Sequence, residues 1–199
     1  MEVLESEKLS PFKKKYFEHA KKSSLYKNVL NTNGNIVFGR GSDNPRVVFI
    51  GEAPGQEENK QGRPFVGRSG KLLDKWIEEI GLEKKDFTVI NVVPIIPLDN
   101  NSIRKPTDEE IKYFLPFTEK YLELLAPEVI VLMGRSAASI FDNSISLGEI
   151  KHWKTTKLFF IYHPSYYLRN GGRGFENTLI KLKDLLQDTS KQAGLKQFE

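Results

Sequence analysis

The sequence predicts an α/β protein, with a central parallel sheet of four strands and helices on both of its faces. Three observations lead to this fold class. Short apolar runs rich in valine and isoleucine have the length of buried strands. Longer amphipathic segments with capping signals separate these runs. Because crossovers between parallel strands are right-handed, the repeated alternation places helices on both faces of one sheet.

The first half of the chain is expected to supply two helices and the first two strands. Pro11 suits the first turn of a helix, and apolar residues recur after it at helical spacing. The segment after Gly55 is polar and then carries glycines around an isolated Phe65, which is typical of a functional loop. The expected elements are a helix over 10–22, a polar loop over 28–35, a strand over 47–50, a loop over 56–67, a helix from an N-cap at Ser69 to Gly81, and a strand over 87–93.

The second half continues the same alternation and ends in a polar tail. Thr107 and Glu110 have the spacing of a capping box, which predicts the start of a helix. The chain shows no repeats or linkers, so one domain is expected over residues 1–199, with a flexible tail from about residue 189. The expected elements are a loop over 94–105, a helix over 107–125, a strand over 128–133, a helix over 134–142, a strand over 157–162, a flexible loop over 170–174, and a helix over 175–188.

The composition of the chain excludes several kinds of chemical site and some cellular locations. The chain has no cysteine, which excludes disulfides, thiolate metal ligands and thiol nucleophiles. A net charge of +4 and a pI of about 9.1 weakly favour a polyanionic partner, although a lysine-rich surface explains them equally well. No run approaches the roughly 20 apolar residues of a membrane span, and the first residues lack the apolar core of an export signal. We therefore expect a cytoplasmic protein.

Four chemically distinctive side chains are associated with the ends of the predicted strands. Glu52 follows the first strand, Phe65 lies in the next loop, Asn91 is near the end of the second strand, and His163 follows the fourth. Ligands of open α/β sheets bind beyond the carboxyl ends of the strands, so these positions are expected to converge. Each has an ordinary alternative: a turn cap, a core ring, a loop contact and a structural loop histidine, respectively. Their joint placement at one edge favours a site.

The chemistry of these four side chains fits cleavage of a base–sugar bond. An aromatic ring offers a stacking face for a base. An asparagine amide presents a donor beside an acceptor, which matches O4 and N3–H of uracil but not the opposite pattern of cytosine. A histidine can donate to a developing oxyanion. A carboxylate can position water or stabilise an oxocarbenium-like sugar cation. Such a reaction requires the base to be extruded from the helix.

Three segments resemble the motifs of family 4 uracil-DNA glycosylases. They are Gly51-Glu-Ala-Pro-Gly55, Gly62-Arg-Pro-Phe-Val-Gly67 and His163-Pro-Ser-Tyr-Tyr-Leu-Arg169, and their order and spacing match. The residues from Asn91 and from Arg104 to Ile111 resemble the middle segment of that family. The resemblance spans about residues 20–186. It implies a three-layer α/β/α sandwich and the release of uracil from DNA, the first step of base excision repair.

The resemblance also implies roles for residues of the pocket. Glu52 is similar to the glutamate near the sugar and the attacking water. Gly51 and Ala53 fall in the same motif, and Ala53 stands where the better-known family of these enzymes has a catalytic aspartate. Glu58 resembles a second pocket carboxylate, either activating water or excluding a 5-methyl group. Phe65 would stack on uracil, Asn91 would read its edge, and His163 would donate to O2.

A DNA-contacting segment follows from the same resemblance. The loop over 166–173 is similar to the segment that enters the minor groove, with Leu168 as the expected wedge into the base stack. An ordinary apolar loop residue is the alternative for Leu168. Ser165, Arg169 and Arg173 would contact the DNA backbone. The expected partner is uracil-containing DNA, bound by a monomer.

One departure from the family is large. Family 4 enzymes carry an iron–sulfur cluster held by four cysteines. Their positions fall here on Ala20, Ser23, Ile95 and Phe114, so no cofactor is expected and packing is expected to replace the cluster. The related subfamily that bonds covalently to DNA has a histidine in its middle loop. Residues 99–104 lack it, so turnover is expected rather than trapping.

Two alternatives to a uracil-specific enzyme remain open. The chain could be a non-catalytic DNA-binding or damage-recognition protein, or a glycosylase for other deaminated bases. The tail from Gln192 to Phe198 has part of the spacing of a sliding-clamp-binding peptide, but Glu199 stands where the second aromatic belongs. A disordered polar tail is the alternative for that segment.

Overall fold

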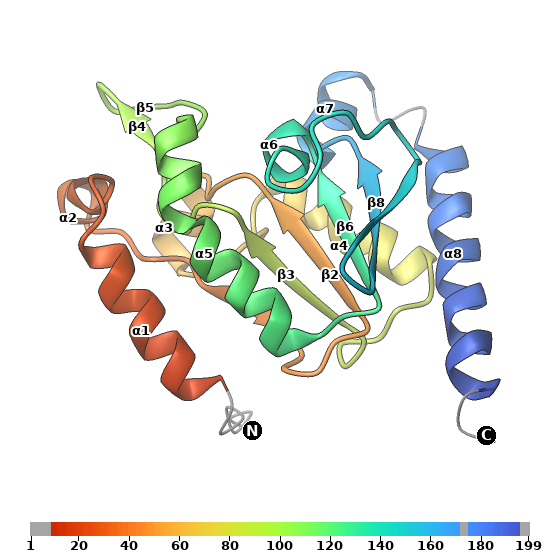
Figure 1. Ribbon diagram of the computed structural model, residues 1–199. Coiled ribbons are helices and arrows are strands. Elements are labelled where there is room, and N and C mark those ends of the chain that lie inside the picture. The colour runs from red at the N-terminus through yellow and green to blue at the C-terminus, as the bar shows by residue number, and fades with distance from the viewer. Residues whose placement is uncertain (1–8, 172–174, 196–199) are drawn as a thin grey trace.

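A six-stranded sheet forms the middle layer of the computed structural model, which describes residues 9–171 and 175–195 (Figure 1). The strand order is β1-β3-β2-β6-β8-β7, and the four central strands run parallel. The strands of this sheet are β1 (Gly39–Gly41), β2 (Val47–Gly51), β3 (Phe87–Asn91), β6 (Val129–Met133), β7 (Ile150–Trp153) and β8 (Thr156–Ile161).

Helices cover both faces of this sheet, as predicted (Figure 1). A separate hairpin, β4 (Leu98–Asp99) with β5 (Ser102–Ile103), stands beside it. The helices are α1 (Ser10–Lys21), α2 (Tyr26–Thr32), α3 (Gln56–Gln61), α4 (Arg68–Glu79), α5 (Asp108–Leu125), α6 (Arg135–Ala138), α7 (Pro164–Arg169) and α8 (Glu176–Leu195).

Alternation along the central strands divides the core into two clusters. Val48 and Ile50 of β2 pack with α1, α2, α5 and α6, whereas Val47 and Phe49 pack with α4, α7 and α8. Successive side chains of a strand point to opposite faces, so a strand buried on both faces is apolar throughout. The three-layer α/β/α sandwich is therefore confirmed. The strand ends define one edge of the sheet, where Gly51 pairs with Asn91.

The sheet is larger than the four strands predicted. The four parallel strands are present, but β1 and β7 add antiparallel edges to β3 and β8. The sequence does not reveal them because they are short and only partly buried. β1 is Gly39-Arg40-Gly41, without an apolar residue, and β7 alternates between exposed and partly buried positions.

Several expected loops contain short helices. The polar loop over 28–35 is largely α2, which ends at Asn33 in a left-handed conformation with a φ of 47°. The polar run after Gly55 is α3, and the segment after His163 is α7. α4 begins after Gly67, so Ser69 is not its N-cap. The loop over 94–105 holds the β4–β5 hairpin. Polar helices this short have too few apolar positions to show a period.

The long helices are closer to expectation. α1 and α5 match the predicted ranges, and Thr107 Oγ1 accepts from Glu110 N at 3.2 Å, as a capping box requires. The helix after β6 is shorter than predicted, since α6 ends at Ala138. The last helix is longer and reaches Leu195 rather than Asp188. Among the described residues, no helix combines the length and apolar character needed to cross a membrane.

Candidate active site

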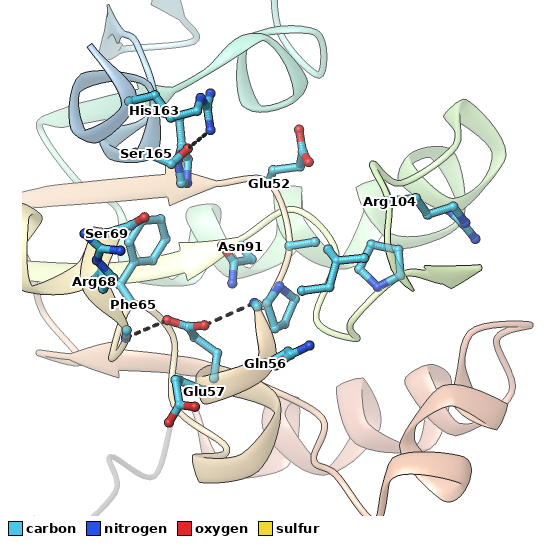
Figure 2. Close-up of a pocket in the computed structure, with 18 residues that line it drawn as sticks. Glu52, Gln56, Glu57, Phe65, Arg68, Ser69, Asn91, Arg104, His163 and Ser165 are labelled. Carbon is cyan, nitrogen blue, oxygen red and sulfur yellow. Dashed lines mark hydrogen bonds between the residues drawn. The ribbon is translucent and has the colours of Figure 1, made fainter. Parts of the chain in front are cut away.

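The predicted strand-end residues line one cavity of about 610 Å³ (Figure 2). Glu52 follows β2, Phe65 lies between α3 and α4, Asn91 ends β3, and His163 follows β8. Since β3, β2, β6 and β8 are neighbours and parallel, their carboxyl ends open on the same edge. Other predicted site residues on the cavity wall are Ala53, Glu58, Ser165 and Arg169.

Gly51 makes room for two of these groups. A Cβ on Gly51 would lie 2.5 Å from Cζ of Phe65 and 2.7 Å from Oδ1 of Asn91, closer than real contacts allow. The absence of a side chain at Gly51 therefore lets the ring and the amide approach the end of β2. Gly51 itself does not line the cavity, so its predicted contact with substrate remains a prediction.

Phe65 has an unusual backbone conformation. Its φ is 53°, in the left-handed region that bulky residues rarely adopt, and its side chain is only 5% exposed. Such a conformation costs about 1–3 kcal/mol and persists only where its surroundings enforce it. The ring lies 5.5 Å from the imidazole of His163, centroid to centroid. Glu58 holds the following backbone, since its Oε1 accepts from Val66 N at 3.0 Å and from Gly67 N at 2.9 Å.

Asn91 is 4% exposed, and its Oδ1 is buried without a hydrogen-bond partner among the described residues. A buried acceptor in this state carries a desolvation cost, and native structures contain few of them. An N–H donor supplied by a ligand in the cavity would remove that cost.

The imidazole of His163 is fixed in one tautomer. Ser165 N donates to Nδ1 at 3.2 Å, and Ser165 Oγ lies 2.8 Å from the same nitrogen (Figure 2). Because Nδ1 is an acceptor, the proton of the neutral ring is on Nε2. The pKa of His163 is lowered to about 4, first by burial and then by the charge of Arg169, while Glu58 opposes the shift. The ring is therefore a neutral donor at physiological pH.

Glu52 has a partner that the sequence analysis did not identify. Ser136, in α6, donates from Oγ to Oε2 of Glu52 at 2.5 Å. This serine follows β6, so it also lies beyond a strand end. The rule that gathered the other site residues could therefore have found it.

The β4–β5 hairpin and the residue after it form a second part of the cavity wall that the sequence did not reveal, since Ile103 and Arg104 line the cavity. Arg104 is held by Glu110, with N···O distances of 2.8 and 2.6 Å.

Comparison with known proteins identifies the family of the chain. The sequence profile described as "Uracil DNA glycosylase superfamily" matches residues 38–187. The chain belongs to the uracil DNA glycosylase superfamily. A type-4 uracil-DNA glycosylase of Thermotoga maritima is 39% identical over 158 residues, which cover 76% of this chain and 80% of that protein. Enzymes of the same description from Archaeoglobus fulgidus and Saccharolobus solfataricus are 37% and 32% identical, covering 69% and 82% of this chain and 74% and 81% of theirs.

The residues predicted to contact DNA are distributed around α7. Leu168 is 38% exposed and Arg169 is exposed on the cavity rim. The hydroxyl of Ser165 is engaged with His163 and accepts from Arg169 Nη1 at 3.4 Å. Arg173 lies outside the described residues, as do residues 196–198 of the predicted clamp-binding segment, whereas residues 192–195 belong to the end of α8. Contact of these residues with DNA remains a prediction.

The four positions aligned with the family's cluster cysteines do not fit an iron–sulfur cluster. Ala20, Ile95 and Phe114 are at most 1% exposed and belong to one apolar cluster, and none can provide a thiolate. Ser23 donates its hydroxyl to the carbonyl of Ala20 at 2.7 Å. We call these four residues and their neighbour His19 the N-terminal corner. No step of the chemistry is assigned to a metal there.

Proposed function

We propose that the chain is a monofunctional uracil-DNA glycosylase, which hydrolyses the bond between uracil and deoxyribose in DNA and so starts base excision repair. The observation that carries the proposal is the buried Oδ1 of Asn91, which has no hydrogen-bond partner in the described part of the chain and lies in a cavity that also contains Phe65 and His163. Uracil extruded from the helix offers the missing N–H at N3, with the O4 acceptor beside it for the amide Nδ2. The ring of Phe65 provides the stacking face.

In the proposed reaction, His163 stabilises the leaving group. As the C1′–N1 bond breaks, negative charge develops on uracil O2, and Nε2–H of the neutral imidazole donates to it. A neutral donor stabilises this anion by hydrogen bonding without transferring its proton. Ser165 and the low pKa keep the ring in the required state. Water adds to C1′ and releases a proton, and the uracil anion takes up a proton from solvent, which leaves an abasic site and free uracil.

We assign the carboxylate function to Glu52 rather than Glu58. Ala53 cannot act as a base. Glu58 accepts from Gly55 N at 3.1 Å through Oε2, in addition to the two N–H groups on Oε1. Both of its oxygens therefore hold backbone, and Glu58 is proposed to position Phe65. Glu52 has Oε2 held by Ser136, and Oε1 remains to orient water or face the sugar cation.

The direct test is a single-turnover assay on a duplex with one uracil. Uracil release with the enzyme in excess, detected as strand cleavage after alkali, is expected, and a matched thymine duplex should stay intact. Binding to uracil-containing DNA without base loss would instead support the non-catalytic alternative. Absence of release at high enzyme concentration would reject the proposal.

The acceptor–donor pair of Asn91 also matches other deaminated bases. Hypoxanthine and xanthine, like uracil, present a ring N–H beside a carbonyl. A panel of uracil, hypoxanthine and xanthine duplexes therefore separates a uracil enzyme from a broader one. Turnover without trapping, a monomeric state, clamp binding through the segment 192–198 and a cytoplasmic, nucleoid-associated location are further predictions. A covalent-complex assay tests turnover without trapping, gel filtration tests the monomeric state, and a clamp pull-down tests clamp binding.

A further inference from the structure

The strained conformation of Phe65 is held from two sides. The φ and ψ angles of Phe65 set the orientation of the peptide group before it relative to the peptide group after it. Fixing both peptide groups therefore fixes the conformation of Phe65. Glu58 binds Val66 N, which belongs to the second peptide group, and Gly67 N, which belongs to the next. The peptide group before Phe65, whose oxygen is the Pro64 carbonyl, needs a different partner.

Arg40 of the edge strand β1 provides that partner. Its Nε donates to the Pro64 carbonyl at 3.0 Å, and its Nη2 reaches the Phe65 carbonyl at 3.5 Å, the outer limit of a hydrogen bond. Arg40 therefore contacts both peptide groups that flank Phe65. The fixed fork of a guanidinium can bind two acceptors at once, which the single point charge of a lysine cannot reproduce.

Helix α4 completes the arrangement. Nη2 of Arg40 lies 2.5 Å from Oδ1 of Asp74, and the Arg40 side chain is only 14% exposed. One turn earlier on α4, a Cβ on Gly70 would lie 1.9 Å from the Phe65 oxygen, so the helix backbone packs directly against this carbonyl. Arg40 is thus fixed between α4 and the loop that carries the stacking ring, and it does not line the catalytic cavity.

We propose that Arg40, anchored by Asp74, is a positioning residue that holds Phe65 in its left-handed conformation and so sets the ring for stacking on the base. This inference rests on the proposed function. It extends the site to the edge strand β1, which the sequence did not reveal. Arg40 touches neither base nor sugar and acts through the backbone of Phe65.

Arg40→Met is the main test. Arg63→Met is the matched control, because Arg63 is an exposed arginine two residues before Phe65. We expect Arg40→Met to lower the single-turnover rate at saturating enzyme about tenfold, a loss of about 1.4 kcal/mol of transition-state stabilisation. The DNA dissociation constant should change no more than in the control. Arg40→Lys should recover only part of the rate, and Asp74→Asn should give a smaller loss in the same direction.

A double-mutant cycle with Phe65→Ala distinguishes positioning from general damage. If Arg40 acts through Phe65, Arg40→Met should have little further effect once the ring is gone. An equal loss of rate in the wild-type and Phe65→Ala backgrounds, or an unchanged rate when Arg40→Met is made in the wild type, would overturn the proposal. Should Arg40→Met fail to fold, the same cycle is run with Asp74→Asn, which changes an exposed carboxylate.

Hydrogen exchange tests the same claim without activity. Amide exchange of a peptide covering residues 62–68 should become faster in Arg40→Met than in the wild type and in Arg63→Met. Unchanged exchange would contradict the role of Arg40 even if uracil is released normally. Absence of uracil release by the wild type would reject the proposed function, while faster exchange in Arg40→Met would still support the positioning role.

Discussion

We call the edge of the sheet that bears Glu52, Phe65, Asn91 and His163 the catalytic edge. It differs from the N-terminal corner in how far its residues match the motifs of the family. At the edge, the polar residues predicted to take part in the reaction are present, and His163 and Glu52 each have a hydrogen-bonding partner. At the corner, the aligned cysteine positions hold residues that cannot bind a cluster. Transition-state stabilisation requires particular groups at particular places. A structural tether requires only sufficient binding energy, which different residues can provide.

The contacts at the N-terminal corner show how packing and hydrogen bonds can provide the binding energy of a tether. The ring of His19 stacks between Tyr113 at 4.1 Å and Phe117 at 4.2 Å, centroid to centroid. Tyr113 Oη donates to the His19 carbonyl at 3.0 Å. The buried Asn28 donates from Nδ2 to the Ile96 carbonyl at 2.8 Å, which ties α2 to the loop after β3. These contacts join α1 to α5 and α2 to the loop after β3, and the four predicted cluster positions lie in or next to these segments.

Phe114→Ala should have the largest effect, and on stability alone. Removing a ring that is 1% exposed leaves a cavity, so the free energy of unfolding should fall by roughly 3–5 kcal/mol. Urea denaturation measures this, and Leu30→Ala, at a residue that is 66% exposed, is the control. The rate per folded molecule should stay within about threefold at low temperature. A large loss of rate without loss of stability would mean that the corner takes part in catalysis.

His163→Ala should show the opposite pattern. Loss of the donor to the leaving group should lower the single-turnover rate by about 10²–10³, because a preorganised donor aimed at developing negative charge contributes about that much to the rate. The free energy of unfolding should change far less than in Phe114→Ala. His152→Ala, at an exposed position of β7, is the control. A rate within twofold of wild type would remove His163 from the mechanism.

Ser136→Ala tests the contribution of the Ser136–Glu52 hydrogen bond and should lower the rate less than His163→Ala does. Without its hydroxyl, Glu52 loses the bond that orients Oε2, and the rate should fall about tenfold, as expected for a hydrogen bond to a charged group. The exposed Ser139, three residues later, is the control. In a Glu52→Gln background the loss should largely disappear. A full additional loss in that background would show that Ser136 acts independently of Glu52.

The pH dependence should be the smallest effect. Since the pKa of His163 is about 4 in the folded protein, the imidazole stays neutral from pH 7.5 to 5.5, and no acid limb is expected near its ordinary value of 6.5. Between pH 6.5 and 4 the unfolded chain binds the extra proton, so the folded state loses stability as the pH falls through that range. An acid limb near pH 6.5 that His163→Ala removes would contradict this assignment.

The sequence predicted the layers and most of the cavity because both follow from strong local patterns. Buried strands such as Val129–Met133 are apolar throughout, and their carboxyl ends locate Glu52 and Asn91 without any contact information. Ser136 follows a strand end, so the same rule could have found it. Arg40 was missed because its role depends on a tertiary contact with a residue 24 positions away. The left-handed backbone of Phe65 is likewise set by partners distant in the sequence. β1 and β7 were missed because an edge strand needs no apolar period.

We expect the catalytic edge to release uracil while the N-terminal corner is held by packing in place of a cluster. The most direct measurement combines iron analysis of the purified protein with single-turnover uracil release from a single-uracil duplex. We predict uracil release by protein that contains no iron. Failure to release uracil with the enzyme in excess, or release only by protein that contains iron, would contradict the account.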